Sequence, residues 1–174
     1  MKTHEYLHAE LRRLHGLLEK GVEDLSPEEW NVIPCEASNS IGWNLWHYAR
    51  TEDNIVRFIL QNRRPTVWQE GGYAESLGLP PVAQGTGMSL DEAHNLRIDD
   101  VDAFRRYMGE VWRSTDEFLA APDESTFDEV ITVRPLGEMP RIRALGQVCV
   151  SHGFGHAGHV DLLRQLLGKS GLGI

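Results

Sequence analysis

One stretch of the sequence, from Leu145 to Leu166, combines the spacing of a buried helix with a cluster of histidines. Alternating steps of four and three residues connect Leu145, Cys149, His152, His156, His159, Leu163 and Leu166. Residues three and four apart share one face of a helix, so the face that carries the leucines inward is expected to carry all three imidazoles inward too. Buried imidazoles without partners are costly. The pattern therefore predicts that hydrogen bonds or a metal ion satisfy them.

Three further segments have the apolar spacing of helices, over about residues 3–20, 41–60 and 89–121, and the histidine-bearing helix is expected over 141–167. A capping box at Ser26 predicts a short helical turn. The glycine- and proline-rich segment from Pro65 to Met88 predicts a long loop packed on the core, and Phe127 to Pro140 predicts a short extended piece or hairpin. We therefore expect an all-α fold, a four-helix bundle that forms a single domain over residues 1–174.

The amino-acid composition indicates which kinds of molecule the chain is suited to bind. The 174 residues include 17 basic and 26 acidic side chains, and the resulting net charge of −9 would repel nucleic acid and anionic lipid surfaces. The chain has two cysteines, Cys35 and Cys149, which lie too far apart to suggest a disulfide scaffold or a zinc ribbon. Its beginning lacks the apolar core of a signal peptide, and no apolar run reaches membrane-spanning length. We expect a cytoplasmic protein that acts on a small molecule.

The histidines on two helices form a candidate metal site. His152 and His156 are one turn apart, the spacing at which two side chains can chelate one ion. The segment over 41–60 adds a polar lane among apolar residues, formed by Asn44, His47, Thr51 and Asn54. His47 would supply a third neutral nitrogen and leave coordination positions open for water or substrate. His159 is either a replacement ligand or a hydrogen-bond donor to a ligand, and the spacing does not separate the two roles.

The sequence also contains two other candidate metal sites, and it has glycines within a segment that is predicted to be helical. His4-Glu5-Tyr6-Leu7-His8 matches a zinc-protease pattern, but a solvated helix face is the preferred interpretation. Cys149 could supply a thiolate, although a buried cysteine usually acts as a small hydrophobe. These helix-weakening glycines lie at 146, 153, 155 and 158. We expect them to permit close helix approach or to leave room beside the metal.

Two segments carry a family resemblance. Residues 40–50 read SIGWNLWHYAR and residues 152–164 read HGFGHAGHVDLLR. Together with the loop from Trp68 to Pro80, they resemble the DinB/YfiT-like metalloenzyme family over nearly the whole chain. The resemblance implies a four-helix bundle with up-down-down-up connectivity, often as a homodimer. It also implies that His47, His152 and His156 bind a divalent ion such as zinc or nickel, with His159 where many relatives carry glutamine.

Family members of known activity use a low-molecular-weight thiol, so the favoured hypothesis is an enzyme whose metal activates such a thiol for transfer or isomerisation. In this hypothesis His159 orients a ligand or moves a proton, and the loop from Pro65 to Met88 shields the site. Two alternatives stay open. The same ion could activate water for hydrolysis, or the protein could be a non-catalytic bundle that binds a metal or a small ligand in a stress response.

Overall fold

The computed structural model describes residues 1–174 and is mostly helical. Its helices are α1 (Thr3–Lys20), α2 (Pro27–Trp30), α3 (Ile41–Asp53), α4 (Val67–Glu70), α5 (Tyr73–Leu77), α6 (Leu90–Asn95), α7 (Val101–Ala120), α8 (Arg141–Ala144) and α9 (His152–Leu166). The π-helical segment η1 (Asn54–Ile59) continues α3, and a second one, η3 (Leu145–Ser151), joins α8 to α9. A 3-10 turn, η2 (Glu124–Thr126), precedes the strands β1 (Val130–Val133) and β2 (Gly137–Pro140).

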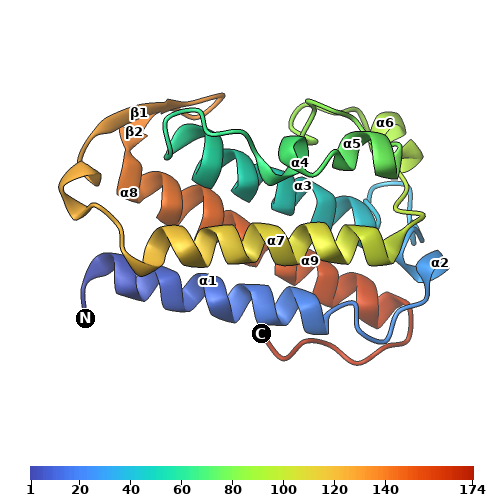
Figure 1. The fold of residues 1–174 in the computed structure, drawn as a ribbon. Helices are drawn as coiled ribbons and strands as arrows, with labels where there is room; N and C mark the ends of the chain where they lie inside the picture. The colour runs from blue at the N-terminus through green and yellow to red at the C-terminus, as the bar shows by residue number, and fades with distance from the viewer.

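The long helices lie side by side along the length of the molecule (Figure 1). Helix α1 packs against α7 and α9, and α3 packs against the same two helices from the other side. Apolar side chains fill the space between them, and Trp30, Trp46 and Tyr107 are completely buried there. No helix has the length and apolarity needed to cross a membrane. The strands β1 and β2 pair as an antiparallel hairpin with Val130 opposite Pro140, which confirms the expected hairpin.

Three of the four predicted long helical segments are confirmed. Helix α1 covers residues 3–20, α3 with η1 covers 41–59, and α8, η3 and α9 together cover 141–166. The capping box at Ser26 also forms, since the Ser26 hydroxyl accepts from the backbone of Glu29 while the Glu29 carboxylate accepts from the backbone of Ser26. The π-helical turns were not predicted, because the apolar spacing around them is close to that of an α-helix.

The prediction of one continuous helix over 89–121 is wrong. Helix α6 ends at Asn95, and α7 begins at Val101 after an extended connection. The Asn31 side chain holds this connection, because its Oδ1 accepts from Ile98 N at 2.8 Å and its Nδ2 donates to Ile98 O at 2.9 Å. Asp100 then caps α7 by accepting from Ala103 N at 2.8 Å. Asn31 lies 67 residues from Ile98, so the local spacing of apolar residues does not indicate this contact.

The segment from Pro65 to Met88 packs on the core, as expected, but it contains the two short helices α4 and α5. The buried Asp53 carboxylate fixes the start of α4 by accepting from Val67 N at 2.9 Å and from Trp68 N at 3.0 Å. Burial raises the pKa of Asp53, and these two backbone donors oppose the rise. The segment is thereby held against α3, next to the histidines.

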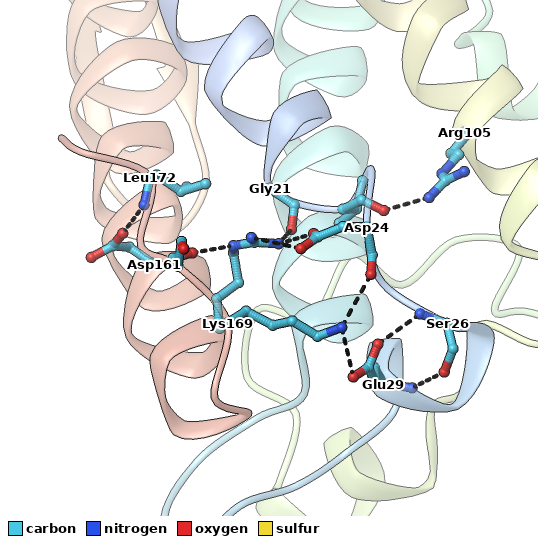
Figure 2. A network of polar contacts seen from close by, with 11 residues as sticks. Gly21, Asp24, Ser26, Glu29, Arg105, Asp161, Lys169 and Leu172 are labelled. Atoms are coloured by element: carbon cyan, nitrogen blue, oxygen red, sulfur yellow. Dashed lines mark hydrogen bonds and ion pairs between the residues drawn. The ribbon is translucent and has the colours of Figure 1, made fainter.

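The C-terminal segment folds back over the connection between α1 and α2 (Figure 2). Arg164 donates to the Asp24 carboxylate at 2.6 Å, and Lys169 donates to the backbone carbonyl of Asp24 at 3.2 Å and pairs with Glu29 at 3.1 Å. Leu172 is buried at the edge of the core. These contacts tie the end of α9 to the end of α1 and so fix the helix that carries two of the candidate ligands.

Candidate metal centre

Three histidine side chains from two helices meet at one point of the core. His47 comes from α3, and His152 and His156 come from the first two turns of α9. The Nε2 atom of His152 lies 3.2 Å from Nε2 of His47 and 3.0 Å from Nε2 of His156. The candidate ligand atoms of all three lie within 4.8 Å of one another. The structure thus brings together the three histidines that the sequence suggested as ligands, and they could hold a metal ion.

The outer nitrogens of two rings have oxygen partners that fix the proton positions. His156 Nδ1 lies 2.9 Å from Asn44 Oδ1, and the Asn44 amide is oriented by its Nδ2, which donates to Ser40 O at 2.8 Å. His47 Nδ1 faces the backbone carbonyl of Gln84. Since both oxygens only accept, each Nδ1 carries the proton and each Nε2 presents a lone pair. Two lone pairs are therefore directed at the point where the rings meet.

Burial keeps these rings uncharged. It lowers the pKa of His47 and of His152, and for His152 the neighbouring His47 adds to the effect. For His156, burial first and then His152 and His47 lower the pKa to about 2. Neutral imidazoles are the form that binds metal ions. One proton shared among the three converging Nε2 atoms would leave a lone pair without a partner. A divalent cation can bind all three nitrogens, so the residues present fit such an ion.

The surroundings of the rings come partly from the segment between Pro65 and Met88, which was expected to shield the site. Trp43 stacks on His47, with ring centroids 5.0 Å apart. Gly85, at φ +95, lies so close that an added Cβ would be 2.7 Å from His47 Nδ1. The Gln84 carbonyl and the Gly85 backbone were missed as site elements, because a main-chain contact has no side-chain signature in the sequence.

The expectation that all three stripe histidines point inward is wrong for His159. His159 is exposed and does not belong to the three-histidine group. Its Nδ1 lies 3.3 Å from Asn44 Oδ1. Leu166 is exposed as well, at 59%. Leu163, between them, stays buried. Three residues advance a helix of 3.6 residues per turn by about 60° less than a full turn, so His159 and Leu166 lie at the exposed edge of the face that carries His156 and Leu163 inward.

The two other candidate metal sites do not gather ligands. His8 Nε2 pairs with Asp116 at 2.7 Å, and His4 is buried 3.9 Å from Glu124, so the expectation of a solvated face is wrong for His4. Cys149 is fully buried outside the histidine group, and burial raises the pKa of its thiol well above the usual value. Cys149 thus has the environment of a small hydrophobe rather than of a thiolate ligand.

A buried carboxylate beneath the histidines was not predicted. Glu52 is completely buried and accepts from the Tyr48 hydroxyl at 2.5 Å and the Thr115 hydroxyl at 2.6 Å, while its Oε2 lies 3.0 Å from His15 Nε2. The Tyr48 ring lies with its centroid 6.2 Å from that of His152. This Glu52 network joins α1, α3 and α7 directly behind the histidine rings, and two of its members, His15 and Thr115, are far from Glu52 in the sequence.

A cleft of about 1190 Å³ opens from the histidines. His47 and His152 line one part of it, and the remaining walls come from α3, η1, η3, the loop at residues 84–86 and the hairpin at residues 132–136. Its volume is that of a site for a small organic molecule. A ligand in this cleft would have access to the nitrogens of two candidate metal ligands.

The glycines of α9 differ in the space around them. A Cβ on Gly153 would lie 2.4 Å from Leu14 Cδ2 and 2.6 Å from Tyr48 Cε2, whereas a Cβ on Gly155 would meet nothing within 4 Å. We expect Gly153→Ala to destabilise the protein by about 1–3 kcal/mol through overpacking. Gly155→Ala should stabilise it by about 0.5–1 kcal/mol through helix propensity. Urea unfolding measures both, and equal shifts for the two variants would refute the close approach at Gly153.

Comparisons with known proteins agree with this architecture. The sequence matches the DinB superfamily over residues 4–160. A solved structure, described as the crystal structure of the conserved protein of locus from Enterococcus faecalis, superposes with a TM-score of 0.83. It shares 22% sequence identity, and the match covers 97% of this chain and 99% of that chain. No curated protein matches the sequence. At this identity the structural likeness shows a shared fold.

Proposed function

The chain belongs to the DinB superfamily, and we propose that it binds one divalent ion through Nε2 of His47, His152 and His156 and uses it to activate a small thiol. The observation that carries the proposal is the convergence of three neutral imidazole nitrogens, two of them with Nδ1 held by an oxygen acceptor. Zinc or nickel suits such a nitrogen donor set. When bound, the ion would lower the pKa of a thiol placed in an open coordination position.

The surrounding residues would prepare the site for this chemistry. Asn44 and the Gln84 carbonyl would hold the rings of His156 and His47 in the orientation that directs Nε2 inward. The loop at residues 84–86 lies on the Nδ1 side of His47 and would limit the access of water to the ring from there. His159 reaches the same Asn44 oxygen at 3.3 Å, so we assign it a role in orienting a ligand through Asn44.

We propose one domain over residues 1–174, with α1, α3, α7 and α9 as a four-helix bundle of up-down-down-up connectivity. The packing of α1 and of α3 on both α7 and α9 supports this arrangement. We also propose a homodimer that works in the reducing cytoplasm, and the two free cysteines are compatible with that compartment.

The proposed activation of a thiol can be tested on protein loaded with cobalt(II), a spectroscopic substitute for zinc. Adding 2-mercaptoethanol or cysteine is expected to produce a sulfur-to-cobalt charge-transfer band that saturates with thiol concentration. The reason is that three protein ligands leave a coordination position open. The His156→Ala variant, which removes one proposed ligand, should show no saturable band at the same protein concentration.

Other outcomes would favour the alternatives. Hydrolysis of a test ester or amide by the loaded protein without thiol would favour activation of water. A cobalt spectrum that no thiol changes would indicate a coordination sphere closed by the protein, as in a structural site. Either result would contradict thiol activation while leaving the metal centre itself in place.

A further inference from the structure

The cleft is long, and the histidines lie at one end of it. Successive turns of one helix face line it, first with His47 and Thr51 on α3 and then with Ile55 and Ile59 on η1. Twelve residues separate the first of these from the last, a rise of roughly 18 Å along a helix axis. Ile55, Phe58 and Val148 give the cleft apolar surface, and the polar side chains of Asn54, Gln147 and Ser151 lie among them. This length and lining suit an elongated ligand with an apolar middle.

The charged residues that line the cleft are all basic, although the chain as a whole carries a net charge of −9. They are Arg63, which follows the end of η1, and Arg134, which follows β1 in the hairpin. No aspartate or glutamate lines the cleft. Figure 1 shows the hairpin beside the end of the helix formed by α3 and η1, away from the middle of α3. The positive charge is thus placed at the end of the cleft distant from His47.

Both guanidinium groups lack an internal partner. Arg57 is paired with Glu70 at 2.6 Å and Arg141 with Glu129 at 2.8 Å, whereas Arg63 and Arg134 form no ion pair. Arg63 also adopts a left-handed backbone conformation, at φ +61, which is unfavourable for a residue with a Cβ. Arg63 and Arg134 are therefore available to bind an external anion and form no ion pair that stabilises the fold.

We propose that the cleft binds an elongated small molecule that carries a carboxylate at the end remote from the histidines, with Arg63 and Arg134 as the residues that select it. Guanidinium groups bind carboxylates through charge-assisted and often bidentate hydrogen bonds. The apolar middle of the molecule would contact Ile55, Phe58 and Val148. This inference rests on the proposed function, because the reactive end of the ligand is placed at His47 and His152. It adds the class of substrate or cosubstrate that the site accepts.

The test compares two probes that differ in one end group, 11-mercaptoundecanoate and 11-mercaptoundecanol. Binding to the cobalt-loaded protein is measured by calorimetry and by the sulfur-to-cobalt band. We expect the carboxylate probe to bind about tenfold more tightly than the alcohol at low salt, with the preference shrinking at high salt. The variant R63Q/R134Q should lose the preference and retain its cobalt. The matched control, Arg113→Gln, removes an arginine that does not line this cleft and should keep the preference.

The outcomes separate this inference from the proposed function. If both probes give the cobalt band with equal affinity, or the preference survives in R63Q/R134Q, the carboxylate site is refuted while thiol binding stands. If the loaded protein binds neither probe, both are refuted. If the protein takes up no metal, the proposed function fails, and calorimetry on the metal-free protein still decides the inference. A carboxylate preference lost in R63Q/R134Q supports it, and equal affinity or no binding refutes it.

Discussion

Replacing Glu52 by alanine is expected to lower the free energy of unfolding by about 3–5 kcal/mol, an amount comparable to breaking a buried ion pair. The substitution would leave the hydroxyls of Tyr48 and Thr115 and the ring nitrogen of His15 without their shared acceptor in the core. Each buried polar group left unsatisfied costs about 1–3 kcal/mol. Chemical unfolding monitored by tryptophan fluorescence measures the loss.

Two controls make the Glu52 prediction specific. Glu52→Gln keeps one acceptor oxygen of similar position, so it should destabilise less than Glu52→Ala. Glu117→Ala removes a carboxylate from an exposed position of α7 and should change stability by less than about 0.5 kcal/mol. A Glu52→Ala protein as stable as the Glu117→Ala protein would contradict the role assigned to the buried network.

Replacing His156 by alanine is expected to weaken metal affinity by more than about 100-fold, because loss of a ligand exceeds the effect of losing a ligand's hydrogen-bond partner. His47→Ala should have the same effect. Asn44→Ala, which removes the acceptor for His156 Nδ1, should weaken affinity by about 10–100-fold. Competition with a chromophoric chelator gives the affinities, and circular dichroism verifies that the variants are folded.

Two other histidines serve as matched controls for the metal prediction. His94, whose Nε2 bonds to the Ser38 carbonyl at 2.9 Å, lies outside the group, and His94→Ala should leave metal affinity unchanged. His159→Ala should keep the metal as well, with at most the loss expected of a positioning residue. Equal losses in His159→Ala and His156→Ala would make His159 a ligand, and unchanged affinity in His156→Ala would contradict the centre.

The sequence predicted the parts of the site that depend on helix periodicity. His152 and His156 are one turn apart on an amphipathic helix, and His47 interrupts an apolar face, so their types and spacing already indicated a common destination. The prediction was wrong for His159, because three residues advance a helix of 3.6 residues per turn by about 60° less than a full turn. His159 therefore lies at the exposed edge of the face on which His156 is buried.

Contacts between distant segments could not be predicted from the sequence. The break before α7 depends on Asn31, and the fixed ring of His47 depends on the backbone of Gln84. Glu52 lies in an ordinary helical segment and belongs to no recognisable sequence motif. The fold nevertheless places the hydroxyls of Tyr48 and Thr115 and the ring of His15 around it. Local propensity is decided within a few residues, whereas these contacts exist only once the helices have packed.

The most direct test of the metal centre is elemental analysis of the wild-type protein purified without a histidine tag. We predict about one divalent ion per chain, either present on purification or acquired on reconstitution with zinc or nickel. This stoichiometry would match the single group of three histidines within 4.8 Å of one another. A folded protein that holds no ion and takes up none on reconstitution would contradict the proposed metal centre and leave the three histidines as a hydrogen-bonded part of the core.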